Sequence, residues 1–187
     1  MWLVNLKQDM GKDLNIRWRS FALEQINSKE GEDWKAWEQG EEYISRGLWA
    51  LRGGIASRKQ GDNQHISYMK SILTAKHVNR VDIRAMDAIV DIAKTCDLDL
   101  ALFTRDLEDE SSLTEISNDY SDARSEGIFG TPTIRFEDGS SVFLKMYTPP
   151  KSDSSDVFRH ILALGQGCRY FGELKRPQPP WPRGALD

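Results

Sequence analysis

Hydrophobic residues recur at helical spacing along most of the chain. Leu3, Leu6 and Met10 form one apolar face, and Gly11 follows where a helix would end, so the chain is predicted to begin with a helix. Four later segments repeat this spacing, and each is predicted to be an amphipathic helix. Their apolar faces are Ile66, Met69 and Leu73; Met86, Ile89, Val90 and Ala93; Leu98, Leu102 and Phe103; and Leu113, Ile116, Tyr120 and Ala123.

Two helical segments carry additional signals. The aromatic stretch over residues 33–60 is predicted to be helical, although Gly53 and Gly54 each lower helix stability by roughly 1 kcal/mol relative to alanine. A close packing contact or a kink is therefore expected at these glycines. Ser112–Glu115 fits a reciprocal capping box, and Gly127 stands where the helix that follows would end.

The pattern changes to that of strands in two places. Leu14, Ile16 and Trp18 alternate with polar residues, which predicts a strand over Leu14–Ser20. Residues 133–136 and 142–146 lie on either side of a turn sequence and predict a β-hairpin, and the capping residues at 152–156 begin a final helix. This order of elements predicts an α/β scaffold interrupted by a helical insertion.

Composition narrows the functional classes. The 187 residues are 39% hydrophobic and 29% charged with a net charge of −4, which is typical of a globular protein and gives no basic footprint for nucleic acid. No apolar run approaches the length of a membrane span. The three histidines lack metal-ligand spacing, so no metal site is expected. No resident cofactor is expected either. Cys96 and Cys168 form no C-x-x-C pair and are interpreted as reduced structural thiols of a cytoplasmic protein, Cys96 the more buried.

Pro132 directly precedes a predicted strand. Because a proline cannot donate a ladder hydrogen bond, the backbone beside it stays open to a ligand. If the Thr131–Pro132 bond is cis, Thr131 presents its N–H and C=O outward, where an extended peptide or glutathione can pair as an added strand. The Pro-rich tail contains a P-x-x-P sequence, which either binds an aromatic-grooved module or lies as a strap on the domain.

The segments Trp18–Asn27 and Gly127–Thr133 resemble the DsbA-like family of thioredoxin-fold proteins. The bacterial cytoplasmic FrnE-like branch and the 2-hydroxychromene-2-carboxylate isomerases are the nearest fit, and the resemblance spans most of the chain. It implies a thioredoxin-like scaffold over residues 1–24 and 128–165, a helical insertion over 25–127 and a tail over 166–187.

The resemblance also implies a site and a function. Pro132 would be the family's cis-proline, Thr131, Phe129 and Gly130 would line the substrate groove, and Asn27 would lie near the same cleft. The implied function is thiol–disulfide oxidoreduction, with a thiol or disulfide peptide as partner or glutathione as co-substrate.

The sequence departs from this family at its start. Redox members have a strand and a C-x-x-C sequence before the segment matched by Trp2–Val4, and the isomerases have a serine there, so no catalytic residue is assigned. The chain is interpreted as N-terminally truncated or as lacking the dithiol. The alternatives are a glutathione-dependent isomerase or transferase, and a non-catalytic peptide-binding module.

The first strand of the scaffold would be missing from such a chain. The strands over Leu14–Ser20 and Thr133–Phe136 would lose a shared neighbour, and unpaired buried backbone groups cost roughly 1–3 kcal/mol each. We expect a gap in the sheet, a closer approach of the two strands, or a strand supplied by another chain in a homo-oligomer. The isolated chain is expected to be poorly stable or oligomeric.

Overall fold

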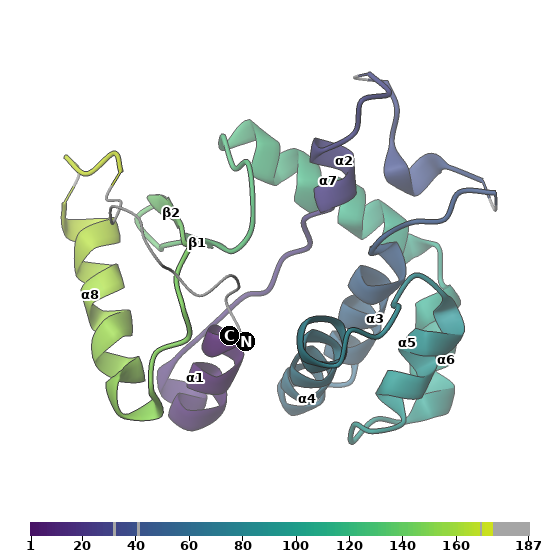
Figure 1. Ribbon diagram of the computed structural model, residues 1–187, viewed down its shortest axis with the longest axis horizontal. Helices are drawn as coiled ribbons and strands as arrows, with labels where there is room; N and C mark the ends of the chain where they lie inside the picture. Colours follow the sequence, from purple (N-terminus) through teal and green to yellow (C-terminus); the bar gives the residue numbers. More distant parts are fainter. Residues whose placement is uncertain (32, 41, 169, 174–187) are drawn as a thin grey trace. The chain divides into compact units, whose positions relative to one another are not determined.

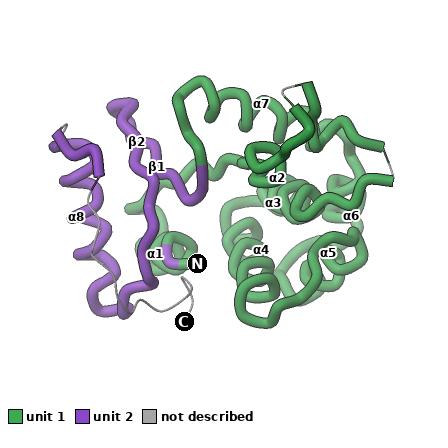
Figure 2. The backbone as a smooth tube through the Cα atoms, turned by 45° about the horizontal axis from the view of Figure 1, so that its top comes forward, with its two compact units in different colours: residues 1, 3–129 green, residues 2, 130–187 purple. Residues whose placement is uncertain are grey.

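The structure is a computed structural model that describes residues 1–31, 33–40, 42–168 and 170–173. The chain is mixed α/β, mostly helical, with one small antiparallel sheet of two strands in its described part. It divides into two compact units (Figure 2). The first contains Met1 and Leu3–Phe129, and the second contains Trp2 and the residues from Gly130 onward. No described helix is long and apolar enough to cross a membrane.

Helix α1 (Trp2–Met10) confirms the predicted first helix. Gly11 ends it with a positive φ of 56°, a conformation that glycine adopts readily. The Lys7 ammonium donates to the carbonyl oxygens of Gly11 and Leu14 at 2.9 and 2.8 Å. A cation therefore stabilises the negative end of the helix dipole, and a 3₁₀ turn (Gly11–Asp13) follows.

The predicted strand over Leu14–Ser20 is wrong, because residues 14–20 belong to no described strand. Side chains take the place of a ladder partner in this extended segment. The Trp18 carbonyl accepts from Arg58 at 2.8 Å, and the Ser20 N–H donates to the Asp119 carboxylate at 2.7 Å. The alternating pattern reflects alternate burial along the segment and not pairing with a neighbouring strand.

Helices α3 (Leu48–Lys59), α4 (Asp62–Leu73), α5 (Met86–Ala93) and α6 (Leu100–Glu108) enclose one core of the first unit (Figure 1). A π-helical turn (Thr74–Val78) follows α4. Tyr68, Ile89, Phe103 and Leu107 are fully buried there. Gly53 lies against the ring of Tyr68, so the packing contact expected at this glycine is present.

A second core cluster of the first unit joins α2 (Leu23–Ile26), a 3₁₀ turn (Ala36–Glu38), α3 and α7 (Ser111–Ser125). The helix predicted over residues 33–60 is wrong before Leu48. The Glu24 carboxylate accepts from the hydroxyls of Tyr43 and Ser45 and from the N–H of Arg46. The Ser45 hydroxyl oxygen in turn accepts from the Leu48 N–H at 2.8 Å. This network holds residues 43–46 in an irregular path, and α3 begins after them.

The start of α7 differs from the predicted capping box, whereas its end is confirmed. The Ser112 hydroxyl donates to the Asp109 carbonyl oxygen, and the Asp109 carboxylate accepts from the Ser111 N–H at 2.9 Å. Asp109 therefore supplies the capping carboxylate. Hydrogen bonding to Ser111, followed by that to Lys59, lowers the pKa of Asp109 to about 2. Gly127, with φ 77°, follows the last turn.

The second unit contains the predicted hairpin and final helix. Strand β1 (Thr133–Arg135) pairs with β2 (Ser141–Phe143), with Ile134 opposite Val142. A 3₁₀ turn (Lys151–Asp153) leads into α8 (Ser154–Gly167), on which Gly165 lies against Phe136 of the hairpin. The polyproline tail was predicted over residues 166–187. The structure describes only 166–168 and 170–173 of this range, and α8 continues to Gly167; the rest of the predicted tail lies outside the described residues.

Candidate functional site

The Thr131–Pro132 peptide bond is cis, as the sequence analysis expected. Thr131 is exposed, and its backbone N–H and C=O form no hydrogen bond with any described residue. The carbonyl of Pro132 accepts from the Leu144 N–H at 2.9 Å, so hairpin pairing begins one residue later. Thr131 therefore offers a free donor and a free acceptor at the entrance to β1.

Gly130 fixes the backbone that leads into this position. It is buried, and a β-carbon on it would stand 3.2 Å from Cε2 of Phe143 on β2. Its carbonyl oxygen accepts from the Thr133 hydroxyl at 2.7 Å. The contact with Phe143 and this hydrogen bond hold the turn on both sides of Thr131.

The remaining predicted site residues belong to the first unit. Phe129 is 61% exposed and is the last residue of that unit. Asn27 is exposed after α2, and its side-chain amide donates to the Leu23 carbonyl oxygen at 2.7 Å. Gly130, Thr131 and Pro132 are consecutive in the second unit, and the groove that would unite them with Phe129 and Asn27 stays a prediction.

The two cysteines do not differ as expected, because both are half-buried. Cys96 follows α5, packs against the first core cluster, and its thiol lies 3.6 Å from the Ile92 carbonyl oxygen. Cys168 follows the last residue of α8. The described residues include no group of three or more His, Cys, Asp or Glu side chains that could hold a metal ion.

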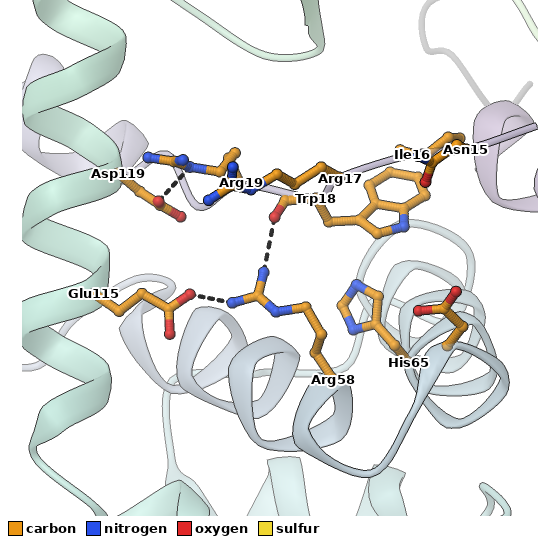
Figure 3. Close-up of a pocket in the computed structure, with 10 residues that line it drawn as sticks. Asn15, Ile16, Arg17, Trp18, Arg19, Arg58, His65, Glu115 and Asp119 are labelled. Atoms are coloured by element: carbon orange, nitrogen blue, oxygen red, sulfur yellow. Dashed lines mark hydrogen bonds and ion pairs between the residues drawn. The ribbon is translucent and has the colours of Figure 1, made fainter.

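A cavity of about 380 Å³ in the first unit was not predicted (Figure 3). Its walls come from the extended segment after α1, the end of α3, the start of α4 and one face of α7. The lining residues are Asn15, Ile16, Arg17, Trp18, Arg19, Arg58, Asp62, His65, Glu115 and Asp119. Three cations and three carboxylates thus surround one cavity, beside an indole and an imidazole.

Ion pairs across the cavity join the extended segment and α3 to α7. Arg19 pairs with Asp119 and Asp122, and Arg58 pairs with Glu115 while donating to the Trp18 carbonyl. Asp119 is only 5% exposed. Figure 3 shows Glu115 and Asp119 one turn apart on α7, facing Arg58 and Arg19.

His65 is the most deeply buried titratable side chain of this cavity, with 4% exposure. Burial, followed by the nearby Arg58 charge, lowers its pKa from 6.5 to about 4. Its Nδ1 lies 3.0 Å from the Ser57 hydroxyl oxygen, and its ring centroid lies 6.1 Å from that of Trp18. His65 is therefore neutral at pH 7. These residues were not singled out as a site from the sequence; the one local signal that could have indicated them is the spacing of Asp62 and His65, three residues apart at the start of a helix.

Comparison with known proteins gives a distant similarity. No protein-family model matches the sequence. The chain is 24% identical over 183 residues to Uncharacterized protein Rv2286c of Mycobacterium tuberculosis, an alignment that covers 96% of this chain and 76% of that protein. The name of that protein states no activity.

Proposed function

We propose that this chain is a DsbA-like thioredoxin-fold protein that binds an extended thiol- or disulfide-bearing peptide, glutathione included, at Thr131. Its role would be in thiol–disulfide oxidoreduction, where this sequence supplies the substrate-binding backbone. The sequence contains no C-x-x-C, so none of its residues is assigned as the redox dithiol. The observation that carries the proposal is the free backbone N–H and C=O of exposed Thr131.

Strand addition is the mode of binding that this geometry favours. β1 pairs with β2 along one edge, and no other described strand pairs with its second edge. An extended peptide could donate to the Thr131 carbonyl and accept from its N–H, as in β-augmentation. Main-chain bonds of this kind are independent of side-chain identity. A preference for cysteine would therefore come from the groups beside the edge.

A pair of substitutions at Thr131 tests this mode. Thr131→Pro removes the backbone donor, whereas Thr131→Ala keeps it and removes only the side chain. Titration calorimetry with oxidised glutathione and with a cysteine-containing peptide should show binding to the wild type and to Thr131→Ala, and weaker binding to Thr131→Pro. Circular dichroism of each variant checks that the fold is retained.

The ligand that binds separates this proposal from its alternatives. Equal affinity for the peptide and for its Cys→Ser analogue would favour a non-catalytic peptide-binding module. Binding of reduced glutathione alone would favour the glutathione-dependent isomerase or transferase. If none of these ligands binds, the proposal that Thr131 forms a peptide-binding edge is wrong.

A further inference from the structure

The cavity of the first unit contains two unpaired charges of opposite sign. Of the six charged residues that line it, four are joined in the ion pairs between Arg19 and Asp119 and between Arg58 and Glu115. Arg17 and Asp62 form no hydrogen bond or ion pair with any described residue. A cation and a carboxylate thus border the same cavity without pairing with each other.

His65 adds an unpaired buried acceptor. The Ser57 hydroxyl lies 2.9 Å from the Gly54 carbonyl oxygen and 3.0 Å from His65 Nδ1. Ser57 has one hydroxyl proton, so both contacts are hydrogen bonds only if Ser57 donates to Gly54 and Nδ1–H donates to Ser57. This arrangement leaves Nε2 unprotonated. Nε2 is buried and has no hydrogen-bond partner among the described residues, which is uncommon for a buried polar atom.

The unpaired hydrogen-bond acceptors and the unpaired donor lie on different walls of the cavity. Asp62 and His65 are three residues apart on α4, a spacing that places them on the same face of the helix, and both accept hydrogen bonds. Arg17 belongs to the extended segment that forms another wall and can only donate. Figure 3 shows the His65 ring beside the Trp18 indole, which gives this end of the cavity an aromatic surface.

We infer that the cavity binds a small zwitterion of the amino-acid type. Its ammonium group would donate to the Asp62 carboxylate and to His65 Nε2, and its carboxylate would pair with Arg17. An ammonium carries three donors and no acceptor, which suits two acceptors on one helix face. The cavity volume of about 380 Å³ lies within the range of small-molecule sites. This site lies wholly within the first unit and does not rest on the function proposed for Thr131.

Ligand-observed NMR with the twenty common L-amino acids tests the inference on the full chain. At least one should receive saturation from the protein, and titration calorimetry then gives its affinity. The analogue of that amino acid without the ammonium group and the analogue without the carboxylate should each bind at least about tenfold more weakly, as expected for loss of a charge-assisted contact.

Two variants that each remove one charge test whether ligand binding depends on Asp62 and Arg17. Asp62→Asn and Arg17→Met alter exposed side chains that hold no other element, and each should weaken binding by about tenfold or more. Asp97→Asn and Arg46→Met change exposed residues outside the cavity and should bind as the wild type does. In the wild type, the ligand should also move the ¹⁵N resonance of His65 Nε2.

Three results would overturn the inference. They are saturation transfer to none of the amino acids, wild-type affinity in both Asp62→Asn and Arg17→Met, and equal affinity for the analogue without the ammonium group. Thr131→Pro separates this site from the proposed peptide edge. It should leave amino-acid binding unchanged even if glutathione binding is lost.

Discussion

The Tyr68 ring occupies the space that a side chain at Gly53 would need. A β-carbon built on Gly53 would overlap the Tyr68 hydroxyl and stand 2.7 Å from its Cζ, and Tyr68 is fully buried. The same hydroxyl donates to the Ala50 carbonyl oxygen at 3.2 Å. The packing of α3 against α4 thus depends on the missing side chain.

Gly53→Ala is expected to destabilise the first unit. Helix propensity would favour alanine by roughly 1 kcal/mol, but overpacking of a filled core costs about 1–3 kcal/mol. The difference is a net loss of about 1 kcal/mol, and of about 2 kcal/mol at most, in the free energy of unfolding measured with urea. Gly54→Ala is the matched control, because its β-carbon would have its nearest neighbour, His65 Cε1, at 4.0 Å. It should increase stability, and equal destabilisation by both changes would contradict this packing argument.

The buried His65 should make stability depend on pH. Its pKa is about 4 in the folded state and 6.5 for an unburied imidazole, so the unfolded state binds more protons between these values. The free energy of unfolding should therefore fall as pH decreases from 6.5 to 4, by on the order of 2 kcal/mol. Urea titrations across this range measure the change. His65→Gln should flatten the slope, and an unchanged slope in that variant would assign the effect to other groups.

Arg58→Met is expected to loosen the extended segment. Arg58 donates to the Trp18 carbonyl and pairs with Glu115, and hydrogen bonds to charged groups contribute about 1.5–3 kcal/mol. Partial exposure reduces the expected loss of stability to about 1 kcal/mol. Amide exchange should accelerate over residues 15–20 while the α3–α6 core stays protected. Arg84→Met breaks a solvent-exposed pair with Asp82 and should change neither measurement.

The indole of Trp2 and the hydroxyl of Ser154 should be energetically coupled. The indole N–H donates to the hydroxyl oxygen at 2.6 Å, and the Trp2 ring packs edge-on against Phe158. In a double-mutant cycle, Trp2→Phe and Ser154→Ala should each destabilise the protein, with a coupling energy of about 1 kcal/mol. Additive effects would show that the contact contributes nothing beyond packing.

Local patterns predicted those elements whose signals lie within a few residues. The periodic apolar face and Gly11 defined α1, Gly127 marked the end of α7, and the turn sequence located the hairpin. The path of residues 14–20 and 43–46 depends instead on distant side chains. Asp119 is about a hundred residues from Ser20, and Glu24 is about twenty from Ser45. No sequence window contains both partners, so alternation was interpreted as a strand and aromatic spacing as a helix.

The same contrast between local and distant determinants applies to the two candidate sites. The open backbone at Thr131 follows from the chemistry of the adjacent proline, and the sequence therefore indicated it. The cavity needs four separate segments to meet, and its lining residues share a helix only in two pairs, Asp62 with His65 on α4 and Glu115 with Asp119 on α7. Spacing on one helix does not show which distant segments face it, so this cavity was not predicted from the sequence.

Side chains of helices α3 and α7 anchor the extended segment over residues 14–20, and this anchoring determines which sequence changes the segment tolerates. In a β-ladder, a strand can slip and still find backbone partners, because every residue offers the same groups. Here Arg19, the Ser20 N–H and the Trp18 carbonyl contact particular side chains of α3 or α7. A shift by a single residue would break all of these contacts at once. The alignment of this segment is therefore encoded in residue identity, and one inserted residue would harm it more than most point substitutions.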